Sequence, residues 1–110
     1  MSKLGAPRVR MPAKAAAGQV IEIRALVEHP MESGYRLDNV GKPIARHIVE
    51  RFTVAYDGRE VFSARLHPAV STNPYFAFYL RAARSGEVVF TWADDEGGVV
   101  THTARLEVEG

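Results

Sequence analysis

Four histidines offer the most versatile chemistry in this sequence, because imidazole can bind a metal ion or transfer a proton near neutral pH. They are His29, His47, His67 and His102, and they never occur at the short spacings of a linear metal-binding motif. A fold made of strands could still bring distant histidines together. The spacing alone therefore predicts no metal site.

Two of these histidines directly precede a proline, so we expect them to shape turns. His29-Pro30 and His67-Pro68 both interrupt an alternating pattern, as is typical of a strand end. His102 is expected to be partly buried on the inner face of the last strand. Met31 near His29 would suit Cu(I). Because the sequence contains no cysteine, a blue-copper centre is excluded, and a chaperone-like copper site is left as an alternative.

No group of residues has the pattern of a catalytic site. The serines at positions 33, 63, 71 and 85 lack a nucleophile elbow. Adjacent carboxylates occur only at Asp94, Asp95 and Glu96, directly before two glycines. We expect this run to form a solvated hairpin tip, where no desolvation would raise a pKa. The sequence thus favours a binding or scaffold module over an enzyme.

Alternating hydrophobicity predicts strands along most of the chain. Val88, Phe90 and Trp92 share one face and are expected in the core. We predict seven strands and no helix, with residues 13–18 as a simple connection; the strands fall near residues 8–11, 19–28, 47–56, 60–66, 75–83, 85–93 and 99–108. This pattern in 110 residues predicts a single all-β domain over residues 1–110, an immunoglobulin-like β-sandwich of about seven strands, with a small open barrel as the alternative.

One long segment without periodicity, from His29 to Arg46, is the first candidate for a functional loop. The net charge of +1 combines 13 Lys/Arg and 7 Asp/Glu in residues 1–84 with 1 and 6 in residues 85–110. The arginines are spread singly, which disfavours a nucleic-acid groove. No apolar run is long enough for a membrane span or a signal peptide.

Several segments, in their order and spacing, resemble one known family. They are His29-Pro30-Met31-Glu32-Ser33-Gly34, Gly41-Lys42-Pro43-Ile44, Leu66-His67-Pro68-Ala69, Asn73-Pro74-Tyr75, and Ser85-Gly86 followed by Phe90-Thr91-Trp92. The sequence resembles SoxZ, the Z subunit of the SoxYZ carrier complex of thiosulfate oxidation. The resemblance spans nearly the whole chain.

The resemblance implies an immunoglobulin-like sandwich that forms a heterodimer with the SoxY subunit and has no catalytic residues, cofactor or metal of its own. The partner's C-terminal arm would carry sulfur intermediates on a cysteine between Sox enzymes, to which the complex docks transiently. A periplasmic location, reached by export together with the Y subunit, is implied as well. The alternative is an autonomous small-ligand or copper-binding module.

We expect the partner-binding residues in the long loop, at the corner around position 74, and on the following strand, where loops and aromatic residues favour recognition. The candidates are His29, Met31, Glu32, Ser33, Gly34, Arg36, Asn73, Pro74, Tyr75 and Tyr79. Phe76 and Trp92 are expected to pack in the core instead.

Overall fold

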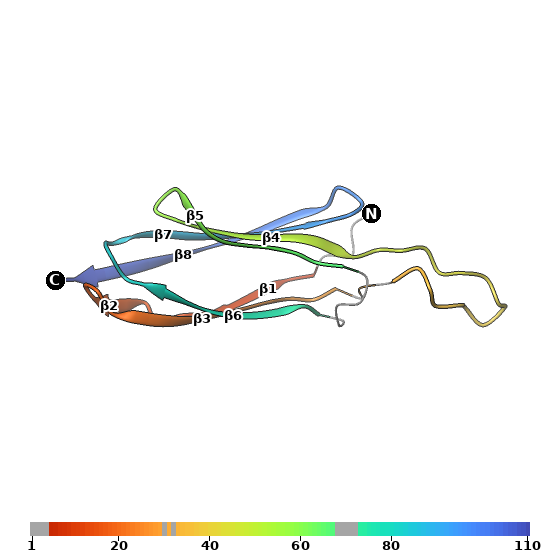
Figure 1. Cartoon of the computed structure of the whole chain (residues 1–110), viewed down its shortest axis with the longest axis horizontal. Coiled ribbons are helices and arrows are strands. Elements are labelled where there is room, and N and C mark those ends of the chain that lie inside the picture. Colours follow the sequence, from red (N-terminus) through yellow and green to blue (C-terminus); the bar gives the residue numbers. More distant parts are fainter. Residues whose placement is uncertain (1–4, 30, 32, 68–72) are drawn as a thin grey trace.

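The chain forms a two-layered β-sandwich in the computed structural model, which describes residues 5–29, 31, 33–67 and 73–110 (Figure 1). A sheet of three strands in the order β1-β3-β6 packs against a sheet of five in the order β2-β8-β7-β4-β5. The described residues contain strands and no helix. The predicted all-β, immunoglobulin-like fold is thereby confirmed.

Eight strands make up the described part of the chain. Their bounds are β1 (Pro7–Arg10), β2 (Lys14–Ala16), β3 (Val20–Val27), β4 (Val49–Tyr56), β5 (Arg59–Arg65), β6 (Tyr75–Arg81), β7 (Gly86–Asp94) and β8 (Val99–Glu109). Except for the parallel pair β2 and β8, all paired strands are antiparallel.

The core lies between the sheets and is built from the alternating faces that the sequence predicts. Phe52, Phe90 and Trp92 are fully buried, and Phe76 of the smaller sheet stacks on Phe52 with ring centroids 4.7 Å apart. A second stack joins Phe62 and Phe78 at 4.6 Å. The expectation that Phe76 and Trp92 are packing residues is confirmed.

The prediction of a simple connection at residues 13–18 is wrong, because this segment contains β2. Lys14–Ala16 pairs in parallel with Glu107–Glu109 at the end of β8, and Ala15 is buried. Three residues are too few to show an alternating pattern in sequence. The strand is stabilised by its distant partner rather than by its own composition.

The end of the sandwich where β4 turns into β5 is closed by a hairpin and a tyrosine. Asp57 and Gly58 both have positive φ, 51° and 80°, as the predicted two-residue turn requires. The Tyr56 hydroxyl accepts hydrogen bonds from the amides of Ala83 and Arg84 and donates to the Arg84 carbonyl. This hydroxyl fixes the β6–β7 connection to the end of β4.

At the opposite end, the segment between β3 and β4 projects away from both sheets (Figure 1). It gives the chain its elongated dimensions of 61 × 20 × 19 Å. Its tip is an ordered turn in which the Asp38 carboxylate accepts hydrogen bonds from the amides of Val40 and Lys42, both at 2.9 Å. Gly41 completes the turn with a φ of 83°. We call residues 33–46 the projecting loop.

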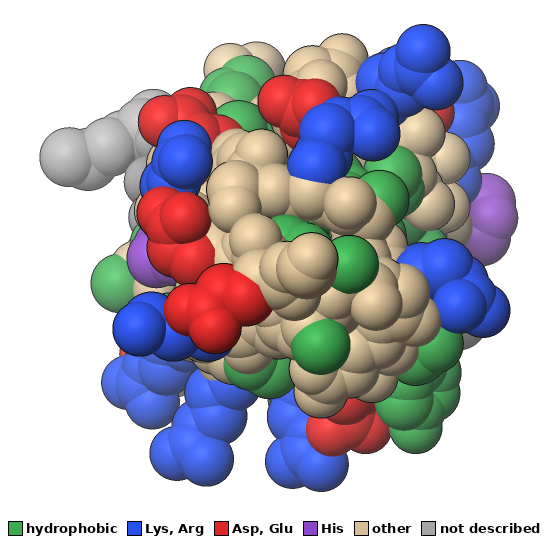
Figure 2. Space-filling view, turned by 90° about the vertical axis from the view of Figure 1, so that its left-hand side faces the viewer, with side chains coloured by type: hydrophobic (Ala, Val, Ile, Leu, Met, Phe, Trp, Pro, Cys, Tyr) green, Lys and Arg blue, Asp and Glu red, His purple; other side chains and the backbone are tan. Residues whose placement is uncertain are grey.

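Acidic and basic side chains lie together at one end of the sandwich (Figure 2), although they are unevenly distributed along the sequence. Figure 2, which faces the end opposite the projecting loop, shows both kinds side by side. Arg46 contacts Asp95 at 3.1 Å and so joins the basic and acidic parts of the chain. Within the described residues, no helix is both long and apolar enough to cross a membrane.

Candidate functional site at the base of the projecting loop

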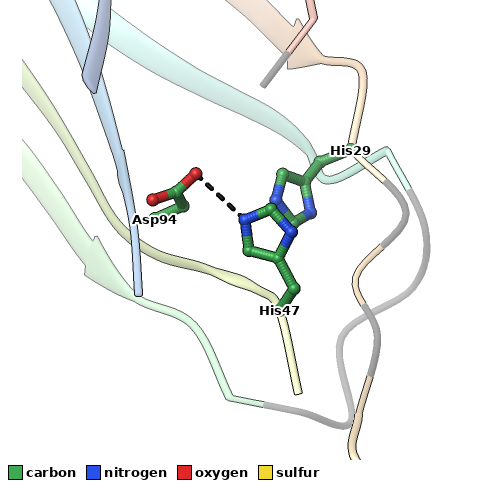
Figure 3. A group of neighbouring side chains, drawn as sticks. All are labelled: His29, His47 and Asp94. Atoms are coloured by element: carbon green, nitrogen blue, oxygen red, sulfur yellow. Dashed lines mark hydrogen bonds and ion pairs between the residues drawn. The ribbon is translucent and has the colours of Figure 1, made fainter. Parts of the chain in front are cut away.

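Three buried polar side chains meet where the projecting loop joins the sandwich (Figure 3). His29 follows the end of β3, His47 precedes β4, and Asp94 ends β7. Their exposed fractions are 2%, 4% and 3%. The antiparallel pairing of β4 with β7 places Val49 opposite Asp94, so the topology itself brings the carboxylate next to the residues that start β4.

Asp94 is held from two sides. One carboxylate oxygen, Oδ2, lies 3.1 Å from Nε2 of His47, while Oδ1 accepts hydrogen bonds from the amides of Glu96 at 3.0 Å and Gly98 at 2.6 Å. Glu96 approaches the same His47 nitrogen to 3.7 Å. The turn and the histidine therefore share one buried carboxylate.

The expectation that all three carboxylates of this turn lie in water is wrong. The side chain of Asp94 is 0% exposed and that of Asp95 is 7% exposed, whereas Glu96 is 47% exposed. The sequence did carry a signal, because Val88, Phe90, Trp92 and Asp94 share one phase of the strand and the first three are buried. His29 continues the buried phase of β3 in the same way.

The two imidazole rings touch edge to face, with centroids 4.5 Å apart and planes at 70°. Nδ1 of His29 accepts a hydrogen bond from the Met31 amide at 3.0 Å. Its other nitrogen, Nε2, is buried and has no hydrogen-bond partner among the described residues, and the same holds for Nδ1 of His47. Unsatisfied buried polar atoms are uncommon in proteins and call for a reason.

Electrostatics favour a neutral His29 ring. Burial lowers the pKa of His29, because desolvation disfavours the imidazolium, and His47 lowers it further. The nearby carboxylates of Asp94, Asp95 and Glu96 act in the opposite direction. A neutral imidazole with an available nitrogen is the form in which histidine binds metal ions.

Three of the predicted partner-binding residues are buried within this chain. His29 lies in the cluster, Pro74 is buried, and Met31 is 6% exposed with its sulfur accepting the Val49 amide at 3.2 Å. The sequence suggested the Met31 sulfur and the His29 imidazole as copper donors; the sulfur accepts a backbone hydrogen bond, and so does Nδ1 of the imidazole. Met31 belongs to the core.

The other candidates divide between the loop base and the sheet face. Asn73 bonds to the backbone of His29 in both directions at 2.8 Å, so the structure does bring the corner and the loop together. Tyr75 and Tyr79 are 55% and 71% exposed on β6. Arg36 is exposed, Ser33 and Gly34 are half-buried, and Glu32 lies outside the described residues. Partner binding by any of them stays a prediction.

Sequence reasoning did not single out the apolar side chains of the projecting loop. Tyr35, Leu37 and Val40 are 86%, 58% and 73% exposed. The turn signal at Asp38 and Gly41 indicates a solvent-facing tip, which leaves neighbouring apolar residues without a core to enter. An exposed apolar group of this kind often marks a binding surface.

Solved structures with this fold include superoxide reductases and a sulfur carrier protein. A superoxide reductase (neelaredoxin) from Ignicoccus hospitalis has a TM-score of 0.73 and 16% identity, covering 96% of this chain and 82% of that one. The sulfur carrier protein SoxY from Chlorobium limicola f thiosulfatophilum has a TM-score of 0.69 and 14% identity, covering 96% and 80%. At such identities the likeness shows the fold alone.

Sequence comparison identifies the family. No curated protein matches the chain. The profile of the family described as "Sulphur oxidation protein SoxZ" matches residues 9–105, which is most of the chain. This agrees with the resemblance carried by the segments around His29, Leu66 and Asn73. The chain belongs to the SoxZ family and is a subunit of the Sox sulfur-oxidation system.

Proposed function

We propose that this chain is the non-catalytic half of a sulfur-carrier heterodimer. In this proposal it binds a SoxY subunit, whose cysteine holds the sulfur intermediates, and presents that subunit to the Sox enzymes. Its membership of the SoxZ family supports the assignment. The sequence has no cysteine, so the chain has no thiol of its own that could exchange with the partner's sulfur adduct.

The exposed apolar tip of the projecting loop is the observation that carries the proposal. Tyr35, Leu37 and Val40 stand clear of the sandwich, on a turn that Asp38 holds with two hydrogen bonds. A preformed turn loses little conformational entropy when it binds. Such a tip is suited to a hydrophobic contact with a second folded protein, here the Y subunit.

A basic cleft near the base of the loop supports the carrier role. It has a volume of about 310 Å³, and its charged lining consists of three arginines, His67 and one carboxylate, that of Glu50; the arginines are Arg46, Arg51 and Arg65. Arg51 and Arg65 lie directly opposite each other on β4 and β5, and like charges in that position are destabilising. An anionic sulfur group on the partner's arm would relieve this repulsion.

The cellular setting follows from the same proposal. The heterodimer would act in the periplasm, which this chain would reach together with its Y subunit. The exposed outer face of β6, with Tyr75 and Tyr79, offers a second surface for transient docking of Sox enzymes. Aromatic residues of this kind are enriched in protein interfaces.

Co-purification with the Y subunit tests the proposal. Replacing Tyr35 and Val40 together with serine should weaken the affinity for the Y subunit roughly 10-fold or more, because interface anchors contribute about 1–2 kcal/mol each. The melting temperature should stay unchanged, since both side chains are exposed. Affinity is measured by calorimetry and melting by circular dichroism.

Val61→Ser is the matched control, because Val61 is also an exposed valine, at 43%, but lies on β5. It should bind the Y subunit like the unaltered chain. If the unaltered chain, the double variant and Val61→Ser all bind the Y subunit with equal affinity, the projecting loop is not part of the interface. Failure of the unaltered chain to assemble with any Y subunit would overturn the proposed function itself.

A further inference from the structure

We propose that His29, His47 and Asp94 form a binding site for one divalent transition-metal ion, with Zn²⁺ as the ion to test. The site lies at the base of the projecting loop and uses two imidazole nitrogens and one carboxylate oxygen (Figure 3). Zinc accepts this donor set, and three protein ligands leave one position open. The inference does not depend on the partner proposed above.

The donor atoms are close to the arrangement that an ion requires. One ligand atom of each residue lies within 4.8 Å of the other two, and the pair formed by His47 Nε2 and Asp94 Oδ2 is 3.1 Å apart. Two donors on one tetrahedral Zn²⁺, each about 2.1 Å away, are roughly 3.3 Å apart. One pair therefore already fits, and the 4.8 Å limit on the other separations exceeds this spacing by only about 1.5 Å.

A fourth protein ligand is within reach. Glu96 Oε1 lies 3.7 Å from His47 Nε2, and its side chain is 47% exposed, so it can turn toward an ion without leaving a packed position. If Glu96 stays in solvent, water takes the fourth place. The carboxylates of Asp94 and Glu96 together also neutralise the charge of a divalent cation.

Burial distinguishes this group from an ordinary surface cluster. All three side chains are more than nine-tenths buried. Within the part of the chain that the structure describes, Nε2 of His29 and Nδ1 of His47 have no hydrogen-bond partner. In Figure 3 the two rings lie together with Asp94 beside them. A cation bound to His29 Nε2 would give this buried nitrogen a partner, which the described protein atoms do not supply.

Binding requires a proton to move on each imidazole ring. His47 now meets the Asp94 carboxylate through Nε2, so an ion on that nitrogen replaces this hydrogen bond, and the ring proton of a neutral His47 moves to Nδ1. Nδ1 of His29 now accepts the Met31 amide, so a neutral His29 carries its proton on Nε2. A metal ion on Nε2 moves that proton to Nδ1, where it meets the Met31 N–H, and the Met31 amide must turn away.

The site would fasten the projecting loop at both ends. His29 and His47 are the residues that enter and leave the loop region, and Asp94 belongs to the β7–β8 turn. One ion would thus connect three segments that are distant in sequence. Its effect is expected on the rigidity and stability of the loop base, which gives the site readouts other than activity.

Calorimetric titration of the untagged, chelator-treated full chain with ZnCl₂ tests the proposal. We expect one ion per chain. At a free concentration of about 100 times the dissociation constant, the melting temperature should rise by roughly 10 °C. His29→Gln should weaken binding roughly 100-fold or more, since even altering an outer partner of a ligand costs about 10–100-fold.

His67→Gln is the matched control, because this histidine is exposed and is not part of the cluster. It should bind zinc like the unaltered chain. Should His29→Gln not fold, imidazole NMR of the unaltered chain decides: zinc must shift the signals of His29 and His47 while those of His67 and His102 stay in place. No saturable binding, or equal shifts of all four histidines, overturns the site.

Discussion

Two hairpin turns at opposite ends of the chain's central strands begin with the same residue type but place it in opposite surroundings. Asp57 follows β4, has its side chain 42% exposed and pairs with Arg84. Asp94 ends β7, has its side chain fully buried and binds His47 together with two turn amides. Both turns contain glycine with positive φ, at Gly58 and Gly97.

The difference shows that turn chemistry and burial are specified separately. Glycine and aspartate determine that the chain reverses at both places. Whether a turn is buried depends on other segments of the chain. His29 and His47, at the base of the projecting loop, pack against the turn at Asp94. One aspartate becomes part of a buried polar cluster, while the other stays in a solvent-exposed ion pair.

Replacing Asp94 gives the largest expected effect. Asp94→Ala leaves Nε2 of His47 and the amides of Glu96 and Gly98 without their acceptor. Losing one partner of a buried polar pair costs about 3–5 kcal/mol. Urea denaturation of the metal-free chain should therefore show a loss of this size in the free energy of unfolding.

Asp57→Asn is the matching change at the other turn. Asparagine tolerates the φ of 51° at this position, and an exposed ion pair contributes at most about 1 kcal/mol. The loss of stability should thus be several times smaller than for Asp94→Ala. If the two variants lose comparable amounts of free energy of unfolding, the buried and the exposed aspartate do not differ in their contribution to stability.

Met31→Ala tests the contrast between a buried and an exposed side chain within the segment that joins β3 and β4. The sequence suggested that Met31 contacts a partner, but its side chain is 6% exposed and packs in the core. Truncating a buried methionine costs roughly 2–4 kcal/mol, so denaturation should report most of the effect. Leu37→Ala, at a side chain that is 58% exposed, should change the stability by less than about 0.5 kcal/mol.

The sandwich could be predicted from the sequence because its strands alternate cleanly. The phase of Val88, Phe90 and Trp92 correctly indicated a buried face, and Asp57-Gly58 correctly indicated a hairpin. Strand β2 could not be predicted, because its three residues depend on pairing with β8. Local patterns predict elements well where the element is long enough to repeat.

The polar cluster was harder to predict, because its members are far apart in sequence. Considered alone, His29 and Asp94 each looked like a turn residue, and His47 looked like the first residue of a strand. The phases of β3 and β7 do point inward at His29 and Asp94, but a polar residue at a strand end is usually solvated. Only the pairing of β4 with β7 and the path of the loop bring the three together.

The smallest expected effect is on the pH dependence of stability, which should involve the turn at Asp94 and not the turn at Asp57. Burial lowers the pKa of His29 in the folded chain, so the unfolded chain binds its proton more readily. The neutral His29 ring therefore contributes its full share to the free energy of unfolding at pH values above its pKa in the unfolded chain, about 6.5. This contribution is lost as the pH falls from there through the folded pKa, with a slope of at most about 1.4 kcal/mol per pH unit for one proton.

Urea titrations between pH 8 and pH 5, with chelator present, measure this slope. His29→Gln should make it shallower, because glutamine does not titrate. Asp57→Asn should leave it unchanged, because the guanidinium of Arg84, the partner of Asp57, stays charged throughout this range with or without that carboxylate. A slope that is the same with and without His29 would mean that the proton is taken up elsewhere, and that the buried ring does not distinguish the two ends.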